Sequence, residues 1–252
     1  MDESDNKTHS CAPDDSDYDS PEVTLVLDNE PTSNKRSICQ QCERPKKVCW
    51  CDYLPTPKVL PTSGTSIMII QHPSEKKRKI RTALMALHGL KGGYCEIFVR
   101  RKLSDSDPLC EKIKHLNAYL LYPSAASKDI TTLASDDKEK TLIILDGTWD
   151  EAKKIYTRSS ILQYLPTIHL ELDKKSEYVV RTQPRKKCLS TIETVAHSLA
   201  ILENNSIISE KLLHPLQMLC KFQLSHGAVE HDYKTIKTTN VNSKVLTEIG
   251  LS

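Results

Sequence analysis

From Ser66 onward, short apolar runs alternate with segments of helical pattern, and this alternation constrains the fold more than any other feature of the chain. Parallel strands need long, usually helical connections, so the pattern is typical of an α/β protein with a mostly parallel sheet and helices on both faces. The expected strands are residues 67–70, 96–99, 119–122, 141–145 and 167–172. The expected helices are residues 75–88, 110–116, 149–157 and 191–203, the last with a capping box at Ser190 and Glu193.

Polar residues follow three of the expected strands at the point where each strand ends. QHPSE (71–75) follows the first strand, PS (123–124) the third, and DGTW (146–149) the fourth. A further polar loop, residues 181–187, leads into LST at 189–191. Because ligands of open α/β sheets bind beyond the carboxyl ends of the strands, these loops predict one pocket with an acid, a basic rim and an aromatic wall.

Each of these residues also has a purely structural interpretation. Asp146 could cap the following helix, Trp149 could belong to the core, and His72 could be a turn residue before Pro73. The basic run between residues 76 and 81 could be a solvated helix face. The chain has no P-loop, no G-x-G-x-x-G, no nucleophile elbow and no H-E-x-x-H, which argues against nucleotide hydrolysis and hydride transfer.

Four of the nine cysteines lie within thirteen residues: Cys39, Cys42, Cys49 and Cys51. Four thiolates at this spacing can close a tetrahedral Zn²⁺ site, and the metal would supply the folding energy that so short a segment lacks. A site filled by four protein ligands predicts a structural metal. The alternative is four unrelated reduced cysteines, with the basic residues of the intervening loop either solvated or in contact with phosphates.

The net charge of +2 hides an asymmetry. Residues 1–30 carry ten acids and one base, so the rest of the chain has 34 basic and 23 acidic residues and a net charge of about +11. A basic body indicates a polyanionic partner such as nucleic acid, although a soluble basic protein without such a partner is equally compatible with the charge.

The chain lacks the features of a secreted or membrane protein. It contains no stretch of about 18 apolar residues, and its acidic, Ser-rich N-terminus resembles neither a secretory signal nor a transit peptide. Reduced or metal-bound thiols are then expected, so we expect a cytoplasmic protein, with the nucleus also open.

Composition divides the chain into four segments. We expect a disordered acidic tail at residues 1–36, a zinc-binding module at 37–60, a catalytic α/β domain at 61–225, and a loose C-terminal tail at 226–252.

Five motifs taken in order resemble the DTW-domain family: CQQCERPKKVCWC, QHP-x-E, LLYPS, LDGTW-x2-A and LST-x-E. They span residues 39–203. The family comprises tRNA-uridine aminocarboxypropyltransferases, which are related to the SPOUT methyltransferases. The resemblance implies a SPOUT-like fold, with a knot near the C-terminus as an open possibility. It also implies that S-adenosylmethionine donates its 3-amino-3-carboxypropyl group to N3 of a uridine in the tRNA D-loop, which yields acp3U and releases methylthioadenosine.

The same resemblance suggests which residues form the site. The residues expected to line the cofactor pocket are Leu121, Tyr122, Pro123, Gly147, Thr148, Trp149, Ala152, Leu189, Ser190 and Thr191. Neutral uridine is a poor nucleophile until it loses its N3 proton, and we expect Asp146 to accept or polarise that proton. The residues expected to contact tRNA are Gln71, His72, Arg78, Arg81, Arg181 and Arg185, although one of the arginines could bind the cofactor carboxylate instead.

Two other functions remain compatible with the sequence. A SPOUT-type RNA methyltransferase would use the same fold and cofactor, and only the product mass separates it from an aminocarboxypropyltransferase. A non-catalytic, zinc-bearing RNA-binding protein would bind tRNA with a steep salt dependence and no cofactor, but it leaves the polar strand ends unexplained.

Overall fold

A computed structural model describes residues 37–134, 138–181 and 188–231. The expected acidic tail at 1–36 and most of the expected C-terminal tail lie outside these residues. The described part of the C-terminal tail is anchored, because the amide of His231 donates to the carbonyl of Val179 at 2.7 Å. None of the helices in the described ranges is long and apolar enough to cross a membrane.

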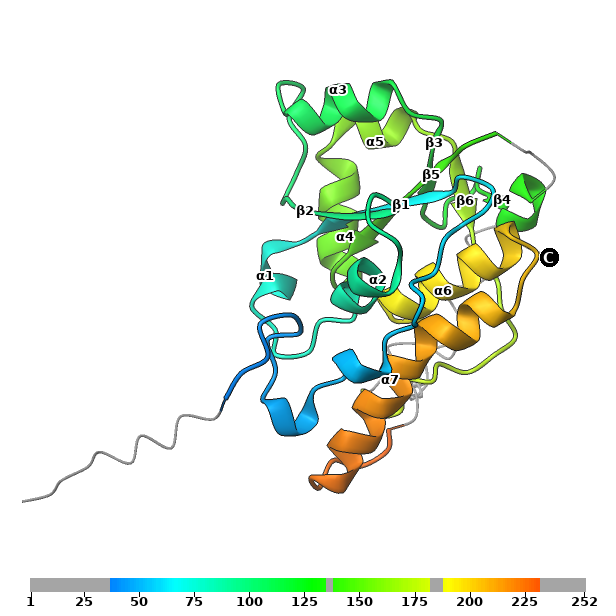
Figure 1. Cartoon of the computed structure of the whole chain (residues 1–252). Helices are drawn as coiled ribbons and strands as arrows, with labels where there is room; N and C mark the ends of the chain where they lie inside the picture. Colours follow the sequence, from blue (N-terminus) through cyan, green and yellow to red (C-terminus); the bar gives the residue numbers. More distant parts are fainter. Residues whose placement is uncertain (1–36, 135–137, 182–187, 232–252) are drawn as a thin grey trace, which may run out of the picture. The chain divides into compact units, whose positions relative to one another are not determined.

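The centre of the molecule is a six-stranded sheet in which every pair of neighbouring strands is parallel, in the order β2-β1-β5-β3-β6-β4 (Figure 1). The strands are β1 (Ser66–Gln71), β2 (Cys95–Val99), β3 (Ala118–Leu121), β4 (Lys128–Asp129), β5 (Thr141–Asp146) and β6 (Thr167–His169). β1 and β5 are neighbouring interior strands, and their last residues, Gln71 and Asp146, stand side by side in register.

Helices cover both faces of this sheet, as the sequence predicts. They are α1 (Pro73–Lys76), α2 (Ala83–Gly89), α3 (Pro108–Lys114), α4 (Trp149–Thr157), α5 (Ser160–Tyr164), α6 (Thr191–Leu202) and α7 (Ile207–Ser225). Short 3-10 helices are η1 (Lys46–Val48), η2 (Cys51–Tyr53) and η3 (Ile130–Leu133). Figure 1 shows α3 and α5 on one side of the sheet and α6 and α7 on the other.

The alternation of side chains along the central strands builds two hydrophobic cores. Ile67 and Ile69 of β1 point into a core that includes residues of α2, α6 and α7. Met68 and Ile70 point to the opposite face, into a core with residues of α3, α4 and α5. A central strand buried on both faces has no polar side, which is why β1 and β5 have almost uninterrupted apolar sequences.

Several features differ from the sequence-based expectation, and β4 and α5 are two elements that the sequence did not predict. The helix expected at 75–88 is two short helices, α1 and α2, because the like-charged run at 76–79 disfavours a continuous helix and Arg78 and Arg81 turn to separate acidic partners. β6 ends at His169 because the edge strand β4 is only two residues long. Helix α7 is not among the expected elements, since Pro215 lies in its interior. The residues 182–187, where a knot would have to be traced, lie outside the described part of the chain.

The cysteine-rich segment shares the core of the α/β domain. Trp50 is 2% exposed and Cys42 is 4% exposed, and both belong to the hydrophobic cluster of α2, α6 and α7. The ring of Tyr53 makes edge contacts with His214 and Phe222 of α7, at centroid distances of 5.5 and 6.0 Å. The stability of this segment is therefore linked to that of the helical face it covers.

Candidate active site and metal centre

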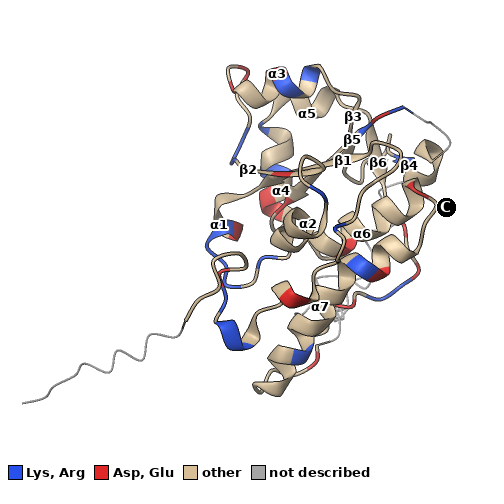
Figure 2. Ribbon diagram, in the orientation of Figure 1, with Lys and Arg blue, Asp and Glu red and all other residues tan. Residues whose placement is uncertain are grey.

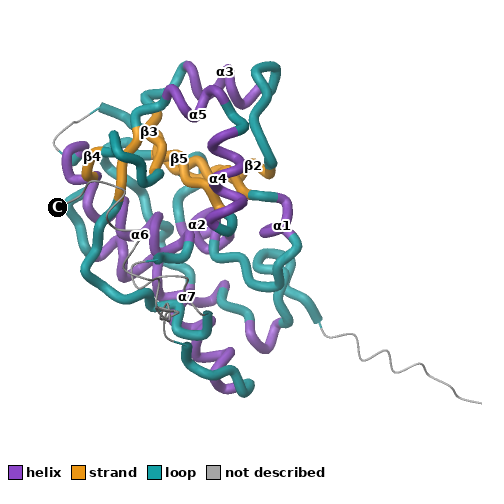
Figure 3. The backbone as a smooth tube through the Cα atoms, turned by 180° about the vertical axis from the view of Figure 1, so that it is seen from behind, coloured by secondary structure: helices purple, strands orange, loops and turns teal. Residues whose placement is uncertain are grey.

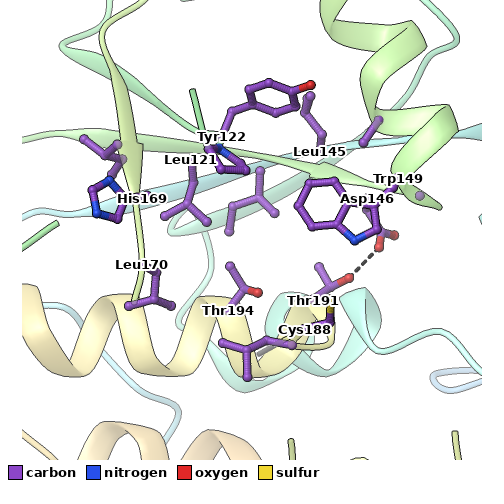
Figure 4. A pocket seen from close by; sticks show the side chains of 16 residues that line it. Leu121, Tyr122, Leu145, Asp146, Trp149, His169, Leu170, Cys188, Thr191 and Thr194 are labelled. Atoms are coloured by element: carbon purple, nitrogen blue, oxygen red, sulfur yellow. Dashed lines mark hydrogen bonds between the residues drawn. The ribbon is translucent and has the colours of Figure 1, made fainter. Parts of the chain in front are cut away.

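Asp146, the last residue of β5, is held by donors from two other parts of the chain. The side-chain amide of Gln71, at the end of β1, donates through Nε2 to Oδ2 of Asp146 at 2.7 Å. The hydroxyl of Thr191, at the first turn of α6, donates to Oδ1. Figure 4 shows this pair beside the indole of Trp149. Both oxygens of a half-buried carboxylate are thus oriented by the fold, although the three residues are far apart in the sequence.

Glu151 joins the loop after β1 to the loop after β5. Its carboxylate accepts hydrogen bonds from the hydroxyl of Ser74 at 2.5 Å and from the amide of Thr148 at 2.8 Å, and it lies 3.2 Å from Nδ1 of His72. Burial alone would raise the pKa of Glu151, but the hydrogen bonds from Ser74 and Thr148 outweigh burial and hold the pKa at about 2. Gly147 is needed for this packing, because a Cβ there would lie 3.0 Å from the Cβ of Glu151.

The structure bears on the structural interpretations that the sequence left open for three residues. Thr148, not Asp146, is the N-cap of α4, and it forms a capping box with Glu151. Trp149 is 52% exposed, so it does not belong to the core. His72 does serve a local structural role, because its Nδ1 accepts from the amide of Ser74 at the start of α1. Asp146 is therefore not a helix cap, and Trp149 is not a core residue.

A cavity of about 230 Å³ opens beyond the ends of β3, β5 and β6. Figure 4 shows Leu121 and Tyr122 on one side of it, Trp149 and Asp146 on another, and Thr194 and Cys188 on the side of α6. The ring of Tyr122 stacks on Tyr156 of α4 at a centroid distance of 4.4 Å, which fixes this wall. The predicted cofactor residues that line the cavity are Leu121, Tyr122, Pro123, Gly147, Trp149, Ala152, Leu189 and Thr191.

A second cavity of about 320 Å³ adjoins the first and shares Asp146, Gly147 and Trp149 with it. Thr148 and Ser190, the other two predicted cofactor residues, line only this second cavity. Their hydroxyls belong to the capping boxes of α4 and α6. Cys188, Leu189 and Thr191 also line both cavities, so Asp146 is one of six residues on the boundary that the two cavities share.

Several lining residues were not singled out by the sequence. Cys188, Thr194, His169 and Leu170 line the first cavity, and Glu75 lines the second. Glu75 is the last residue of the QHP-x-E motif, and this position is the one sequence signal that could have identified it. No local pattern identifies Cys188, Thr194, His169 or Leu170. Their placement depends on α6 and β6 closing over the ends of the central strands.

The residues expected to contact tRNA divide into three groups. Gln71 is 4% exposed and serves Asp146, and Arg81 has a side chain 9% exposed that pairs with Glu43 of the cysteine-rich segment. Arg78 is partly exposed and pairs with Glu75 at 3.1 Å, while His72 contacts Glu151. Arg181 is exposed at the second cavity. Arg185 lies outside the described residues.

The four predicted zinc ligands come together in space. All four Sγ atoms lie within 4.8 Å of one another, with Cys39 to Cys51 at 3.7 Å and Cys42 to Cys49 at 3.5 Å. Zinc–sulfur bonds of about 2.3 Å in a tetrahedron place the sulfurs about 3.8 Å apart, so the spacing fits a tetrathiolate site. Without a cation, burial and the neighbouring thiols raise the pKa of Cys49 to about 11.

A buried arginine beside these sulfurs supports the same assignment. Arg44 is 5% exposed, and its Nε and Nη1 have no hydrogen-bond partner among the described residues. The groups that act on its charge are the thiols of Cys42 and Cys49 and the phenol of Tyr178. A buried cation without acceptors is costly, whereas a zinc tetrathiolate carries a net charge of −2 that Arg44 would partly neutralise. The donor set and its surroundings therefore fit a bound metal.

A parallel sheet with adjoining cavities at its strand ends, and a four-cysteine cluster packed against it that could hold a metal ion, defines an α/β protein with a candidate ligand site and a candidate metal site. A sequence model of the DTW domain matches residues 36–224, and the chain belongs to this family. No solved structure matches the chain.

Relatives that carry the name tRNA-uridine aminocarboxypropyltransferase include the following three. The Drosophila melanogaster enzyme 2 is 40% identical over 210 residues, which cover 82% of this chain and 83% of the relative. The Macaca fascicularis enzyme 2 is 38% identical over 84% of this chain and 72% of the relative. The Arabidopsis thaliana enzyme A is 26% identical over 80% of this chain and 86% of the relative.

Proposed function

We propose that this protein transfers the 3-amino-3-carboxypropyl group of S-adenosylmethionine to N3 of a uridine in the D-loop of tRNA. The products would be acp3U and methylthioadenosine. The names of the relatives support the reaction. The observation that carries the residue assignment is the position of Asp146, whose carboxylate is held by Gln71 and Thr191 where the two cavities meet.

In the proposed reaction the leaving group needs no catalytic group from the protein. S-adenosylmethionine supplies an activated carbon on a sulfonium, and the sulfur leaves as a neutral thioether, so no general acid is required. The acceptor uridine must lose its N3 proton, and in this proposal the carboxylate of Asp146 accepts it. A positioned base of this kind typically contributes about 10²–10⁴-fold to the rate.

The first cavity has the walls that an adenosine group would need. Leu121, Leu189 and the exposed indole of Trp149 offer apolar surface, and the hydroxyls of Thr191 and Thr194 stand on the side of α6. We infer that these residues hold the donor. Zinc bound by the four cysteines would stabilise the fold beneath η1 and η2 and take no part in the reaction.

We propose that tRNA approaches across the basic segment after α1. Lys76, Lys77 and Lys79 are exposed there. Figure 2 shows basic ribbon at α1. An electrostatic contact with phosphates predicts that tRNA binding weakens steeply as salt concentration rises.

The test is incubation of the purified protein with unmodified tRNA and S-adenosylmethionine, followed by mass spectrometry of the nucleosides. The expected result is a uridine carrying the aminocarboxypropyl mass, with methylthioadenosine released in equal amount. A methylated nucleoside with S-adenosylhomocysteine would instead establish an RNA methyltransferase. Binding of tRNA without any modified nucleoside, over a panel of tRNAs, would refute the transferase assignment.

A further inference from the structure

The wall of the second cavity carries three acids, Glu75, Asp146 and Asp150, and one base, Arg181. Glu75 and Arg181 both line it, together with Asp146 and Trp149. Glu75 comes from the loop after β1, and Arg181 comes from the segment before α6, 106 residues later in the chain. Neither charge is used by the proposed proton transfer at Asp146, so their place beside it needs a separate explanation.

Glu75 is a carboxylate in an unusual position. It is 6% exposed, and its Oε1 is 3.1 Å from Nη2 of Arg78. This contact is an ion pair and does not meet hydrogen-bond geometry, since Oε1 has no hydrogen-bond partner among the described residues. Burial and then the charge of Asp146 raise the pKa of Glu75. A cationic group in the cavity would stabilise the charged form of both carboxylates.

Arg181 is positioned from the protein interior but presents its charge to the cavity. Its amide donates to the carbonyl of Tyr178 at 3.1 Å, and Tyr178 is 4% exposed, so the backbone of Arg181 is anchored. The residue itself is exposed, and its guanidinium acts on the charges of Glu75 and Tyr178. A guanidinium in this setting suits a carboxylate ligand, which it can bind through two parallel hydrogen bonds.

We propose that Glu75 and Arg181 bind the two charged groups of the donor's amino-acid end: Glu75 the α-ammonium and Arg181 the α-carboxylate. This inference rests on the proposed function and deepens it. The adenosine would occupy the first cavity and the amino-acid chain the second. The chain between them then passes Asp146, which belongs to both cavities, and the carbon to be transferred is held beside the group that accepts the uridine proton.

This arrangement also gives a physical reason for the choice of carbon. The sulfonium of S-adenosylmethionine is bonded to three carbons, and the one that reacts is the one aligned with the nucleophile. Two charge contacts on the amino-acid end fix that end of the donor, whereas the methyl group carries no charge for the protein to bind. Glu75 and Arg181 would thus be specificity-determining residues of the site.

The experiment compares S-adenosylmethionine with methylthioadenosine, which keeps the adenosine but lacks both the amino-acid chain and the sulfonium charge; decarboxylated S-adenosylmethionine, the third ligand, keeps that charge. Calorimetry measures the Kd of S-adenosylmethionine and of methylthioadenosine, which lacks the amino-acid chain, for the wild type, Arg181→Met and Glu75→Gln. Both variants should bind S-adenosylmethionine about 10- to 100-fold more weakly and bind methylthioadenosine within about twofold of the wild type. Arg158→Met, an exposed arginine outside both cavities, should change neither Kd.

A third ligand assigns each charge to its partner. Decarboxylated S-adenosylmethionine retains the ammonium and lacks the carboxylate, so Arg181→Met should leave its Kd unchanged while Glu75→Gln still weakens it. Equal losses for all three ligands, no loss for any, or a Glu75→Gln variant that also loses methylthioadenosine would overturn the proposal. So would an Arg181→Met defect confined to tRNA binding. A wild-type protein that binds none of the three ligands would refute the proposed function itself.

Discussion

At the scale of single residues, hydrogen bonds from Gln71 and Thr191 orient the carboxylate of Asp146. We expect Asp146→Asn to reduce the single-turnover rate of acp3U formation about 10²–10⁴-fold, because a carboxamide cannot accept the uridine proton. The matched control is Asp173→Asn, an exposed acid outside both cavities, which should retain the wild-type rate. An Asp146→Asn protein with more than about a tenth of the wild-type rate would remove Asp146 from the proposed chemistry.

The lowered pKa of Glu151 predicts that its contribution to stability depends on pH. Its folded-state pKa of about 2 lies below the ordinary value of 4.5, so its charge stabilises the folded state fully above about pH 4.5. That contribution is lost as the pH falls from 4.5 towards 2. Glu151→Gln should therefore lower the Tm by a few degrees at pH 7, and the difference from the wild type should shrink on acidification. A difference in Tm that stays constant down to pH 3 would contradict this role.

At the scale of elements, the start of α6 is tied to the preceding segment through one buried carboxylate. Glu193 is 1% exposed and accepts hydrogen bonds from the amides of Glu177 and Ser190, at 2.6 and 2.7 Å, and from the hydroxyls of Ser176 and Ser190. Glu193 of the expected capping box therefore also joins α6 to the segment at Ser176 and Glu177. Arg181 follows that segment and Thr191 begins α6, and both residues line the second cavity.

We expect Glu193→Ala to reduce the free energy of unfolding by about 3 kcal/mol, because buried donors lose a charged acceptor. Glu210→Ala, which removes an exposed carboxylate from the first turn of α7, should change it by less than about 0.5 kcal/mol. Urea denaturation of the three proteins measures both values. Equal stabilities would show that the four contacts to Glu193 contribute little.

At the scale of the whole molecule, the metal centre and the α/β domain share one hydrophobic cluster through Cys42 and Trp50. Removal of zinc by a chelator should lower the Tm of the entire described domain by roughly 10 °C, in a single transition, because the segment cannot unfold without exposing that cluster. Fluorescence of Trp50, recorded in a Trp149→Phe variant because the chain has two tryptophans, and circular dichroism should report the same midpoint. Two separate transitions would show that the cysteine-rich segment folds independently.

Arg44 should affect the metal directly. We expect Arg44→Met to bind zinc about 10- to 100-fold more weakly in competition with a chromophoric chelator, since the tetrathiolate loses its buried counter-charge. Lys46→Met changes an exposed lysine of the same loop and serves as the control. An unchanged zinc affinity in the Arg44 variant would mean that the buried guanidinium has another partner.

Much of this molecule follows from local sequence patterns. Apolar runs without a polar face predict β1 and β5, the spacing of four cysteines predicts the metal ligands, and the polar residues after each run predict the edge at which the cavities form. These features are readable because strand periodicity, ligand spacing and strand ends each depend on residues close together in the chain.

Only the tertiary structure decided the roles of individual charged and polar residues. Arg81 is basic and lies in a basic run, yet it is buried against Glu43, while Arg181 stays exposed at a cavity. Thr148 caps α4 and leaves Asp146 to face Gln71 and Thr191, and Glu75 becomes a buried acid beside them. Burial, ion pairing and pKa depend on partners that the fold brings from distant parts of the chain, and no local pattern encodes those partners.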